Sequence, residues 1–163
     1  MRAGIITVSD RAAQGLRADA SGPALAKMLA DASIETARTV IVADEKKDIM
    51  KAIRELADSE KLDLILTTGG TGISPRDVTP DATLEVIDKQ VPGMAEVMRH
   101  QSLKITPHAM ISRAVAGIRG NCLIINLPGS PKGATENLAA LMPALRHAFE
   151  KIKGDPSECA VSP

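Results

Sequence analysis

The chain contains almost no aromatic side chains: its 163 residues include a single phenylalanine and neither tryptophan nor tyrosine. It also lacks an excess of charge, because 20 lysine and arginine residues balance 20 aspartate and glutamate residues. Proteins that bind nucleic acids rely on a positive excess and, for single strands, on aromatic rings that stack on the bases. The composition therefore argues against nucleic acid as a partner.

Long apolar stretches and cysteine clusters are missing as well. No apolar run approaches the roughly 20 residues that cross a bilayer, and the first residues lead into a strand pattern instead of a signal peptide, so we expect a cytoplasmic protein without a membrane segment. Cys122 and Cys159 have no spacing typical of a disulfide or zinc site, and we expect free thiols. His100, His108 and His147 lie in separate segments without other ligands at suitable spacing, so we expect no catalytic role for them.

Strand and helix patterns alternate along the chain. The continuous apolar run of residues 3–8 and the strand-like segments 35–42, 62–67 and 121–127 predict four strands. Apolar side chains at helical spacing predict helices over residues 23–31 and 48–59, over 84–103 with a break at Pro92-Gly93, and from Pro131 onward, whereas residues 110–118 are ambiguous. Such strands between amphipathic helices are typical of a parallel sheet covered on both faces. We expect one domain over residues 1–153 and a flexible C-terminal tail over 154–163.

The most informative segment is residues 67–83, where a glycine-dense loop follows an apolar strand and leads into a helix. Gly69, Gly70 and Gly72 allow backbone N–H groups to approach a phosphate closely, and a helix opening near Thr79-Pro80 adds unpaired donors. The loop lacks the lysine of a Walker loop and the third glycine of a dinucleotide fingerprint, which disfavours both of those sites. A loop of this composition is also typical of a tight surface turn, and that interpretation stays open here.

Polar residues directly follow the predicted strands. Ser9 and Asp10 follow the first strand, Asp44 the second, the glycine loop and Asp77 the third, and residues 126–130 the last. The carboxyl ends of parallel strands meet at one edge of a sheet, where α/β proteins bind ligands, so we expect these residues to converge. The glycine-containing loops can hold phosphates, and Asp10, Asp44 and Asp77 offer oxygen ligands for Mg²⁺. The competing interpretation is that Asp10 and Asp44 only cap helices or sit in turns.

Several short motifs occur together in one order. They are Val8-Ser9-Asp10-Arg11, residues 67–83, Ser102-Leu103-Lys104-Ile105-Thr106-Pro107, Ser112-Arg113-Ala114 and Asn126-Leu127-Pro128-Gly129-Ser130-Pro131. Over about residues 3–153 the chain resembles the MogA/MoaB family of molybdenum cofactor biosynthesis, and it is similar above all to molybdopterin adenylyltransferases, including the G domain of gephyrin. The resemblance implies a three-layer α/β/α fold with a mostly parallel sheet, a homotrimer and a MoeA-like molybdate-inserting partner.

The activity that the resemblance implies is Mg²⁺-dependent adenylylation, in which the terminal phosphate of molybdopterin attacks the α-phosphate of ATP and pyrophosphate leaves. By motif, Asp77 and Asp44 are expected to be catalytic and to hold the metal. The nucleotide and its phosphates are assigned to Gly69, Gly70, Thr71, Gly72, Pro128, Gly129 and Ser130. Polarity and position assign the pterin phosphate to Ser9, Asp10, Arg11, Ser112 and Arg113. Such a transfer needs positioning and charge neutralisation more than a nucleophilic side chain.

Two other functions stay open from the sequence. A catalytically silent MoaB-type protein that binds and carries molybdopterin would keep the pocket without the chemistry. A nucleotide pyrophosphatase on the same fold would consume nucleotide without any pterin. The intact segment Arg76-Asp77-Val78-Thr79-Pro80, together with Asp44, favours the active enzyme.

Overall fold

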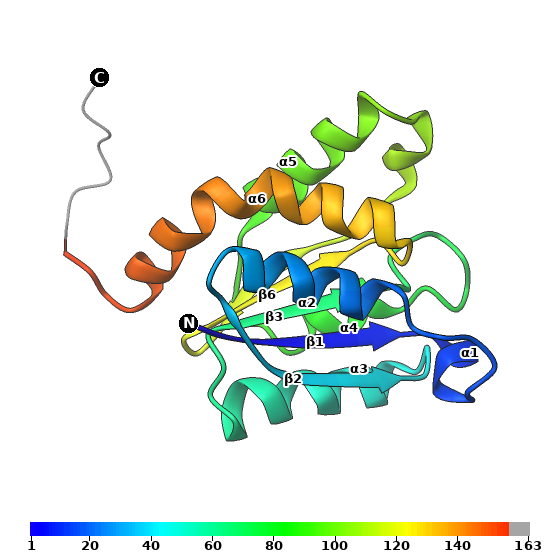
Figure 1. Cartoon of the computed structure of the whole chain (residues 1–163), viewed down its shortest axis with the longest axis horizontal. Coiled ribbons are helices and arrows are strands. Elements are labelled where there is room, and N and C mark those ends of the chain that lie inside the picture. The colour runs from blue at the N-terminus through cyan, green and yellow to red at the C-terminus, as the bar shows by residue number, and fades with distance from the viewer. Residues whose placement is uncertain (157–163) are drawn as a thin grey trace.

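A six-stranded sheet in the order β2-β1-β3-β6-β5-β4 forms the centre of the computed structural model, which describes residues 1–156 (Figure 1). Its parallel strands are β2 (Glu35–Val42), β1 (Arg2–Val8), β3 (Leu64–Thr68) and β6 (Cys122–Leu127). The strands β5 (Ala116–Arg119) and β4 (Lys89–Gln90) add an antiparallel edge. The strands expected from the apolar runs are thus confirmed, and the sheet is mostly parallel as predicted.

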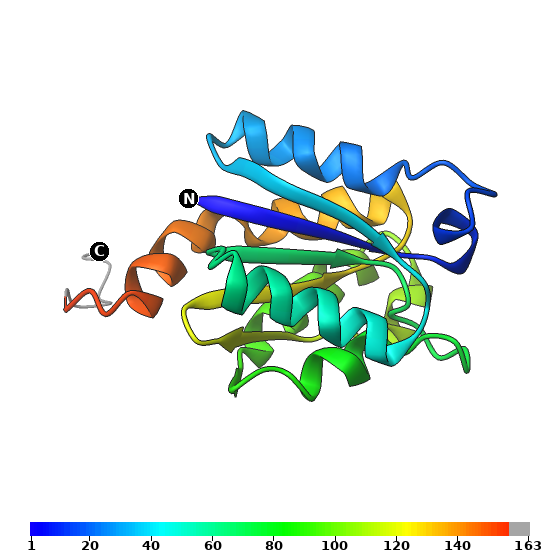
Figure 2. The same cartoon turned by 90° about the horizontal axis from the view of Figure 1, so that it is seen from below.

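Helices cover both faces of this sheet. They are α1 (Asp10–Ala13), α2 (Ser21–Asp31), α3 (Lys46–Arg54), the π-helical turn η1 (Glu55–Ser59), α4 (Thr79–Leu84), α5 (Pro92–Leu103), the 3₁₀ turn η2 (Pro107–Ile111) and α6 (Pro131–Ile152). In Figure 2, α2 and α6 lie on one side of the sheet and α3 and α4 on the other. The predicted three-layer α/β/α architecture is therefore confirmed.

Alternating strand side chains supply a separate core on each face. Ile5 lies in register beside Leu66, and both are buried in the cluster formed with α2, α5 and α6. Ile6 and Ile65 point the other way, into the cluster formed with α3, η1 and α4. Because neighbouring residues of a strand point to opposite faces, a fully apolar strand is stable only when both faces are covered. This explains the unbroken apolar runs of the sequence.

The helix predicted over residues 84–103 is wrong in its first third. α4 ends at Leu84, and the chain then pairs with β5 through Asp88 N–H to the Ile118 carbonyl (2.7 Å) and Val91 N–H to the Ala116 carbonyl (2.8 Å). Pro92, which we interpreted as a break, occupies the first turn of α5, where its missing N–H costs nothing. The ambiguous residues 110–118 divide between η2 and β5.

The predicted C-terminal tail begins directly behind α6, which ends at Ile152. Gly154 and Asp155 stay attached to the end of α6, because their N–H groups donate to the carbonyls of Lys151 and Glu150 at 3.0 Å each. The rest of the expected tail, with Cys159, lies outside the described residues. Cys122 is a free thiol as predicted, and burial raises its pKa to about 12, which makes it unreactive. Within residues 1–156, no helix is both long and apolar enough to span a membrane.

Asn126 belongs to the core and not to the polar edge where we expected it. The side chain is fully buried inside β6, and its Nδ2 donates to the hydroxyls of Thr67 and Thr83 at 2.9 Å each. Its Oδ1 accepts the N–H of Val115 at 3.3 Å. One side chain thereby joins β3, α4 and the start of β5 to β6. Burial of a polar group is tolerated only when its hydrogen bonds are made, as they are here.

The Asn126→Ala variant should therefore lose about 2–4 kcal/mol of unfolding free energy, because it removes three buried hydrogen bonds and leaves the Val115 N–H without its acceptor. Urea denaturation measures the difference. Asn121→Ala is the matched control, since Asn121 is exposed next to the same strand and should change stability by less than about 0.5 kcal/mol. Equal losses in the two variants would contradict the structural role of the Asn126 network.

Candidate functional site

The polar loops converge at the carboxyl edge of the parallel strands, as the sequence predicts. The N–H of Ser9 donates to the Val42 carbonyl at 2.9 Å, which joins the ends of β1 and β2. At the neighbouring strands, the N–H of Gly69 donates to the Leu127 carbonyl at 3.2 Å. The Thr68 hydroxyl also donates to the Pro128 carbonyl at 2.7 Å. The ends of four strands thus form one continuous surface.

The glycine loop is packed too closely for any other residue. Gly69 has φ +110°, and a Cβ there would lie 2.2 Å from the Val8 carbonyl oxygen. Gly70 has φ +60°, and a Cβ there would lie 2.5 Å from the Thr79 hydroxyl. Gly69 is buried, so this part of the loop is not a surface turn; only residues 73–76 are exposed. The glycines bring backbone, not side chains, to the site.

The start of α4 differs from our prediction. We expected unpaired donors near Thr79-Pro80 that would receive a phosphate, but Thr79 is fully buried. Its N–H donates to the Gly70 carbonyl at 3.1 Å, and its hydroxyl donates to the Gly69 carbonyl at 2.9 Å. Pro80 has no N–H to offer. Thr79 therefore holds the glycine loop in place through the carbonyls of Gly69 and Gly70. The hydrogen-bond donors for a phosphate must then come from the loop and not from Thr79.

Two carboxylates flank the loop. Asp44 Oδ1 lies 3.2 Å from the position of a Cβ on Gly70, and Asp77 Oδ2 lies 2.9 Å from one on Gly72. The pKa of the Asp44 carboxyl is raised above its ordinary value, mainly because the group is partly buried. The hydrogen bond from the Asp10 N–H lowers this pKa, whereas the negative charges of Asp10 and Asp77 raise it further. The charge of Asp77 therefore acts on Asp44, and a cation bound near both carboxylates would favour the ionised form of Asp44.

The carboxylate pair fits a magnesium ion better than a metal with an all-protein shell. One oxygen of each carboxylate is already used: Asp44 Oδ2 accepts the N–H of Asp10 (2.7 Å), and Asp77 Oδ2 accepts the N–H of Ser74 (2.8 Å). Within residues 1–156, no group of three or more His, Cys, Asp or Glu side chains could hold a metal. Mg²⁺ keeps several waters and is commonly held by one or two carboxylates plus substrate phosphates, so two carboxylates suffice for it.

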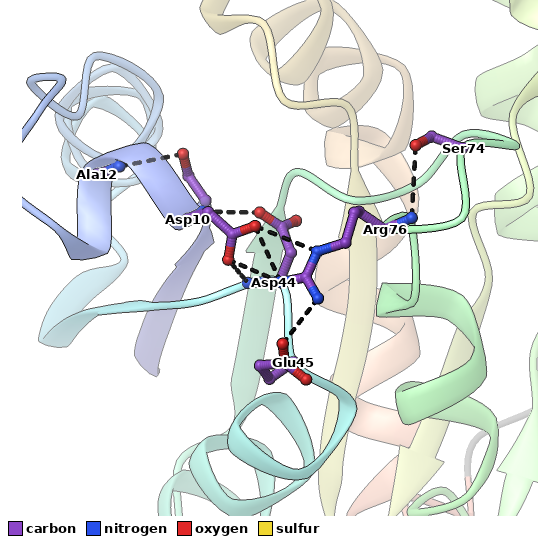
Figure 3. A network of polar contacts seen from close by, with 7 residues as sticks. Asp10, Ala12, Asp44, Glu45, Ser74 and Arg76 are labelled. Atoms are coloured by element: carbon purple, nitrogen blue, oxygen red, sulfur yellow. Dashed lines mark hydrogen bonds and ion pairs between the residues drawn. The ribbon is translucent and has the colours of Figure 1, made fainter.

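Asp10, which the sequence also offers as an oxygen ligand for Mg²⁺, has both carboxylate oxygens occupied by protein donors. Its Oδ1 accepts from the Asp44 N–H (3.0 Å) and from Arg76 Nη2 (2.9 Å), and its Oδ2 accepts from Arg76 Nε (3.2 Å) and Nη2 (2.9 Å) (Figure 3). Arg76 Nη1 also donates to Glu45 at 2.7 Å. The Asp44 N–H, followed by Arg76, lowers the pKa of the Asp10 carboxyl. Asp10 is therefore an ionised bridge between Asp44 and Arg76.

The loop separates two pockets. The first, here called the Ser9 pocket, has a volume of about 330 Å³; the second, called the Ser112 pocket, has about 270 Å³. Of the residues predicted to bind nucleotide phosphate, Gly69, Gly70, Gly129 and Ser130 line the Ser9 pocket, whereas Thr71, Gly72, Pro128 and again Ser130 line the Ser112 pocket. The predicted phosphate residues thus divide between the two pockets, and Ser130 is shared by both.

The residues predicted for the pterin phosphate are not brought together. Ser9 and Ser112 line different pockets, while Asp10, Arg11 and Arg113 line neither of them. Arg113 instead supports the Asp77 segment: its backbone N–H donates to the Thr71 carbonyl (2.8 Å), and its guanidinium donates to the Asp77 carbonyl (3.1 Å) and to Asp81 (2.5 Å).

Several pocket residues were missed from the sequence. In the Ser112 pocket they include Arg99, Ser102, Thr106, His108 and Asn137, and in the Ser9 pocket Arg17, Asp19 and Ser21. The motif 102–107 contained a usable signal, since a Ser and a Thr in it reach the pocket. Asp19 gave none, although it ties two elements together. It accepts the N–H groups of Ser21 (3.0 Å) and Gly22 (2.9 Å) at the start of α2, and it also accepts the hydroxyl of Thr7 in β1 at 2.8 Å.

Comparisons with known proteins agree with one another. Residues 4–147 match the family model described as "Probable molybdopterin binding domain". The molybdopterin adenylyltransferase of Helicobacter pylori is 44% identical over 154 residues, covering 93% of this chain and 88% of that protein. Gephyrin of Dictyostelium discoideum is 43% identical over 163 residues, covering 94% of this chain but 23% of that protein. The solved structure of the molybdopterin biosynthesis enzyme MoaB of Thermus thermophilus is similar with a TM-score of 0.89 and 52% identity, covering 96% of this chain and 99% of that chain.

Proposed function

The chain belongs to the family of molybdopterin-binding domains, and from that premise we propose that it is a molybdopterin adenylyltransferase of molybdenum cofactor biosynthesis. It transfers AMP from ATP to the terminal phosphate of molybdopterin and releases pyrophosphate. The observation that carries this proposal is the pair of pockets on either side of one glycine loop, with Asp44 and Asp77 against that loop. Two substrates with phosphates can meet there.

The two pockets suit different substrates. The Ser112 pocket offers the apolar side chains of Ile105 and Ile111 together with the polar groups of Ser102 and Asn137, which matches a flat ring system with hydrogen-bonding edges, and we assign it to the pterin. The Ser9 pocket is bounded by Gly69, Gly70 and Gly129, and we assign it to the nucleotide. Ser130 lines both pockets and caps α6 by accepting the Gly133 N–H at 3.1 Å, so the positive end of a long helix lies beside both pockets.

The reaction needs no nucleophile from the protein. An oxygen of the pterin phosphate forms a bond to the α-phosphorus of ATP, and the bond from that phosphorus to the bridging oxygen breaks, so that pyrophosphate carries away the electron pair. Asp44 and Asp77 would hold Mg²⁺, which supplies neutralisation of phosphate charge when bound. The chain itself positions the two phosphates through backbone groups of the glycine loop and the start of α6, which is where most of the acceleration of such a transfer arises.

The decisive experiment is an anaerobic incubation of the purified protein with molybdopterin, ATP and Mg²⁺, followed by measurement of adenylyl-molybdopterin and pyrophosphate. We expect both products in equal amounts, and neither when molybdopterin is omitted. Bound molybdopterin without product would identify a silent MoaB-type carrier instead. Pyrophosphate release without molybdopterin would identify a nucleotide pyrophosphatase. The homotrimer, the MoeA-like partner and the cytoplasmic location stay predictions from the sequence.

A further inference from the structure

Asp44 and Asp77 lie on separate segments, and within residues 1–156 no direct hydrogen bond joins their two side chains. Asp44 follows β2 and is half-buried, whereas Asp77 ends a loop whose residues 73–76 are exposed. The hydrogen bonds of Asp77 to Ser74 stay inside that loop: the Ser74 N–H donates to the Asp77 carboxylate at 2.8 Å, and the Asp77 N–H donates to the Ser74 carbonyl at 2.9 Å. They fix the shape of the loop but not its distance from Asp44. Something else has to set that distance.

A continuous chain of contacts runs from the neighbour of Asp77 to Asp44. Arg76 makes three hydrogen bonds of 2.9–3.2 Å to the carboxylate of Asp10. Asp10 and Asp44 are joined in both directions, since the N–H of each donates to the carboxylate of the other, at 2.7 and 3.0 Å. Figure 3 shows Arg76 reaching across to Asp10 and Glu45, with Asp44 directly behind. Arg113 holds the opposite side of the loop through the Asp77 carbonyl at 3.1 Å.

We propose that Arg76 is a positioning residue that, through Asp10, fixes the loop bearing Asp77 against the strand end bearing Asp44, and so sets the spacing of the two carboxylates. Arg76 does not touch the substrate in this role. The inference rests on the proposed function for its catalytic consequence, but the loop restraint itself exists without any substrate. A second consequence is that Asp10 belongs to this restraint and not to the pterin site.

An arginine is required for this arrangement. Its planar guanidinium donates to Asp10 with Nε and Nη2 and to Glu45 with Nη1 at the same time. A lysine at the same position presents one ammonium and cannot keep that fork. The side chain of Arg76 is 52% exposed and that of Asp10 is 36% exposed. An ion pair that is so open to solvent adds little to the stability of the whole fold. Its effect is therefore expected in the loop and in catalysis, not in the unfolding free energy.

The test compares Arg76→Gln and Arg76→Lys with wild type by two measurements. The first is hydrogen–deuterium exchange in the protein without ligands, where the amides of residues 72–79 should exchange about tenfold faster in Arg76→Gln. The second is steady-state kinetics, where kcat should fall about 10- to 100-fold while KM for molybdopterin changes less than about threefold, because a misplaced carboxylate hinders the transfer and not pterin binding. Arg76→Lys should recover only part of each loss.

Asp10→Asn provides the second arm. Asparagine keeps an oxygen that can accept the Asp44 N–H but loses the charge that Arg76 contacts, while the contact of Arg76 with Glu45 remains. Asp10→Asn should therefore show the same kinds of loss as Arg76→Gln, at most equally large. The double variant should then be no worse than Arg76→Gln alone, because Asp10 acts through Arg76. Arg119→Gln is the matched control. Arg119 forms a comparable forked pair with Asp58, with hydrogen bonds of 2.7 and 2.9 Å, and neither residue lines either pocket. Its replacement should leave kcat and the hydrogen exchange of residues 72–79 unchanged.

Wild-type exchange and wild-type kcat in Arg76→Gln would overturn the proposal, and so would additive losses in the double variant. A rise in KM for molybdopterin without faster exchange would also overturn it, since Arg76 would then bind substrate directly. If the wild-type protein forms no product, the proposed function fails while the exchange measurement still decides the restraint. The two failures are therefore distinguishable.

Discussion

Replacing Asp77 by asparagine should lower kcat at least about a hundredfold while the protein stays folded. Asparagine has nearly the size of aspartate, and its side-chain oxygen can still accept the Ser74 N–H that now donates to Asp77 Oδ2 at 2.8 Å. What disappears is the negative charge beside Gly72, a residue that lines the Ser112 pocket. The loss of charge removes half of the carboxylate pair that would hold Mg²⁺ against the reacting phosphates.

The Asp77→Asn variant is measured by the rate of adenylyl-molybdopterin formation at saturating ATP, molybdopterin and Mg²⁺. Binding of molybdopterin should stay within about threefold of wild type, because the Ser112 pocket keeps all its lining residues. Asp58→Asn is the control, since it removes one carboxylate from the ion pair with Arg119, far from both pockets. Near-normal turnover in Asp77→Asn would show that Asp77 is not a catalytic residue of this protein.

The arrangement of the parallel strands could be predicted because their sequence signal is local. Residues 35–42 are predicted as a strand and form β2 with the same bounds. The polar residues behind β1, β2 and β3 reach one edge of the sheet because parallel topology requires it. The glycine loop could also be predicted from the sequence. Its glycines are needed because Val8 and Thr79 approach the loop backbone too closely for a residue with a side chain. These features depend on the spacing of apolar residues, the direction of the strands and the backbone conformation of glycine, and each of these can be inferred from neighbouring residues in the sequence.

Long-range pairings could not be predicted in the same way. Residues 88–91 were predicted to be helical, yet they pair with β5, because the N–H groups of Asp88 and Val91 donate to backbone carbonyls there. Thr79 looked like an open helix start until the structure showed its hydroxyl on the Gly69 carbonyl. Asp10 looked like a ligand, but Arg76, 66 residues away, neutralises it. In each case a partner distant in sequence decides the role, and a pattern read along one chain does not contain that partner.

Gly69→Ala should have the largest effect on stability of any change in the glycine loop, with a loss of about 2–4 kcal/mol of unfolding free energy. Two causes add. The backbone has φ +110°, which side-chain-bearing residues rarely adopt, and the new methyl group would lie 2.2 Å from the Val8 carbonyl oxygen. β1 cannot move aside, because it is hydrogen-bonded to β2 on one side and β3 on the other. The loop must shift instead.

Gly120→Ala separates these two causes. Gly120 also has a positive φ, +55°, but no atom lies within 4 Å of a Cβ built there, so its replacement should cost only about 1 kcal/mol. Urea denaturation of both variants gives the difference due to crowding. Equal losses would mean that backbone conformation alone explains the need for glycine at position 69. Turnover of the folded Gly69→Ala protein should also fall. A Cβ on Gly129 would lie 3.2 Å from the Gly69 Cα, so a shift of Gly69 displaces Gly129 and with it the part of the Ser9 pocket to which we assign the nucleotide.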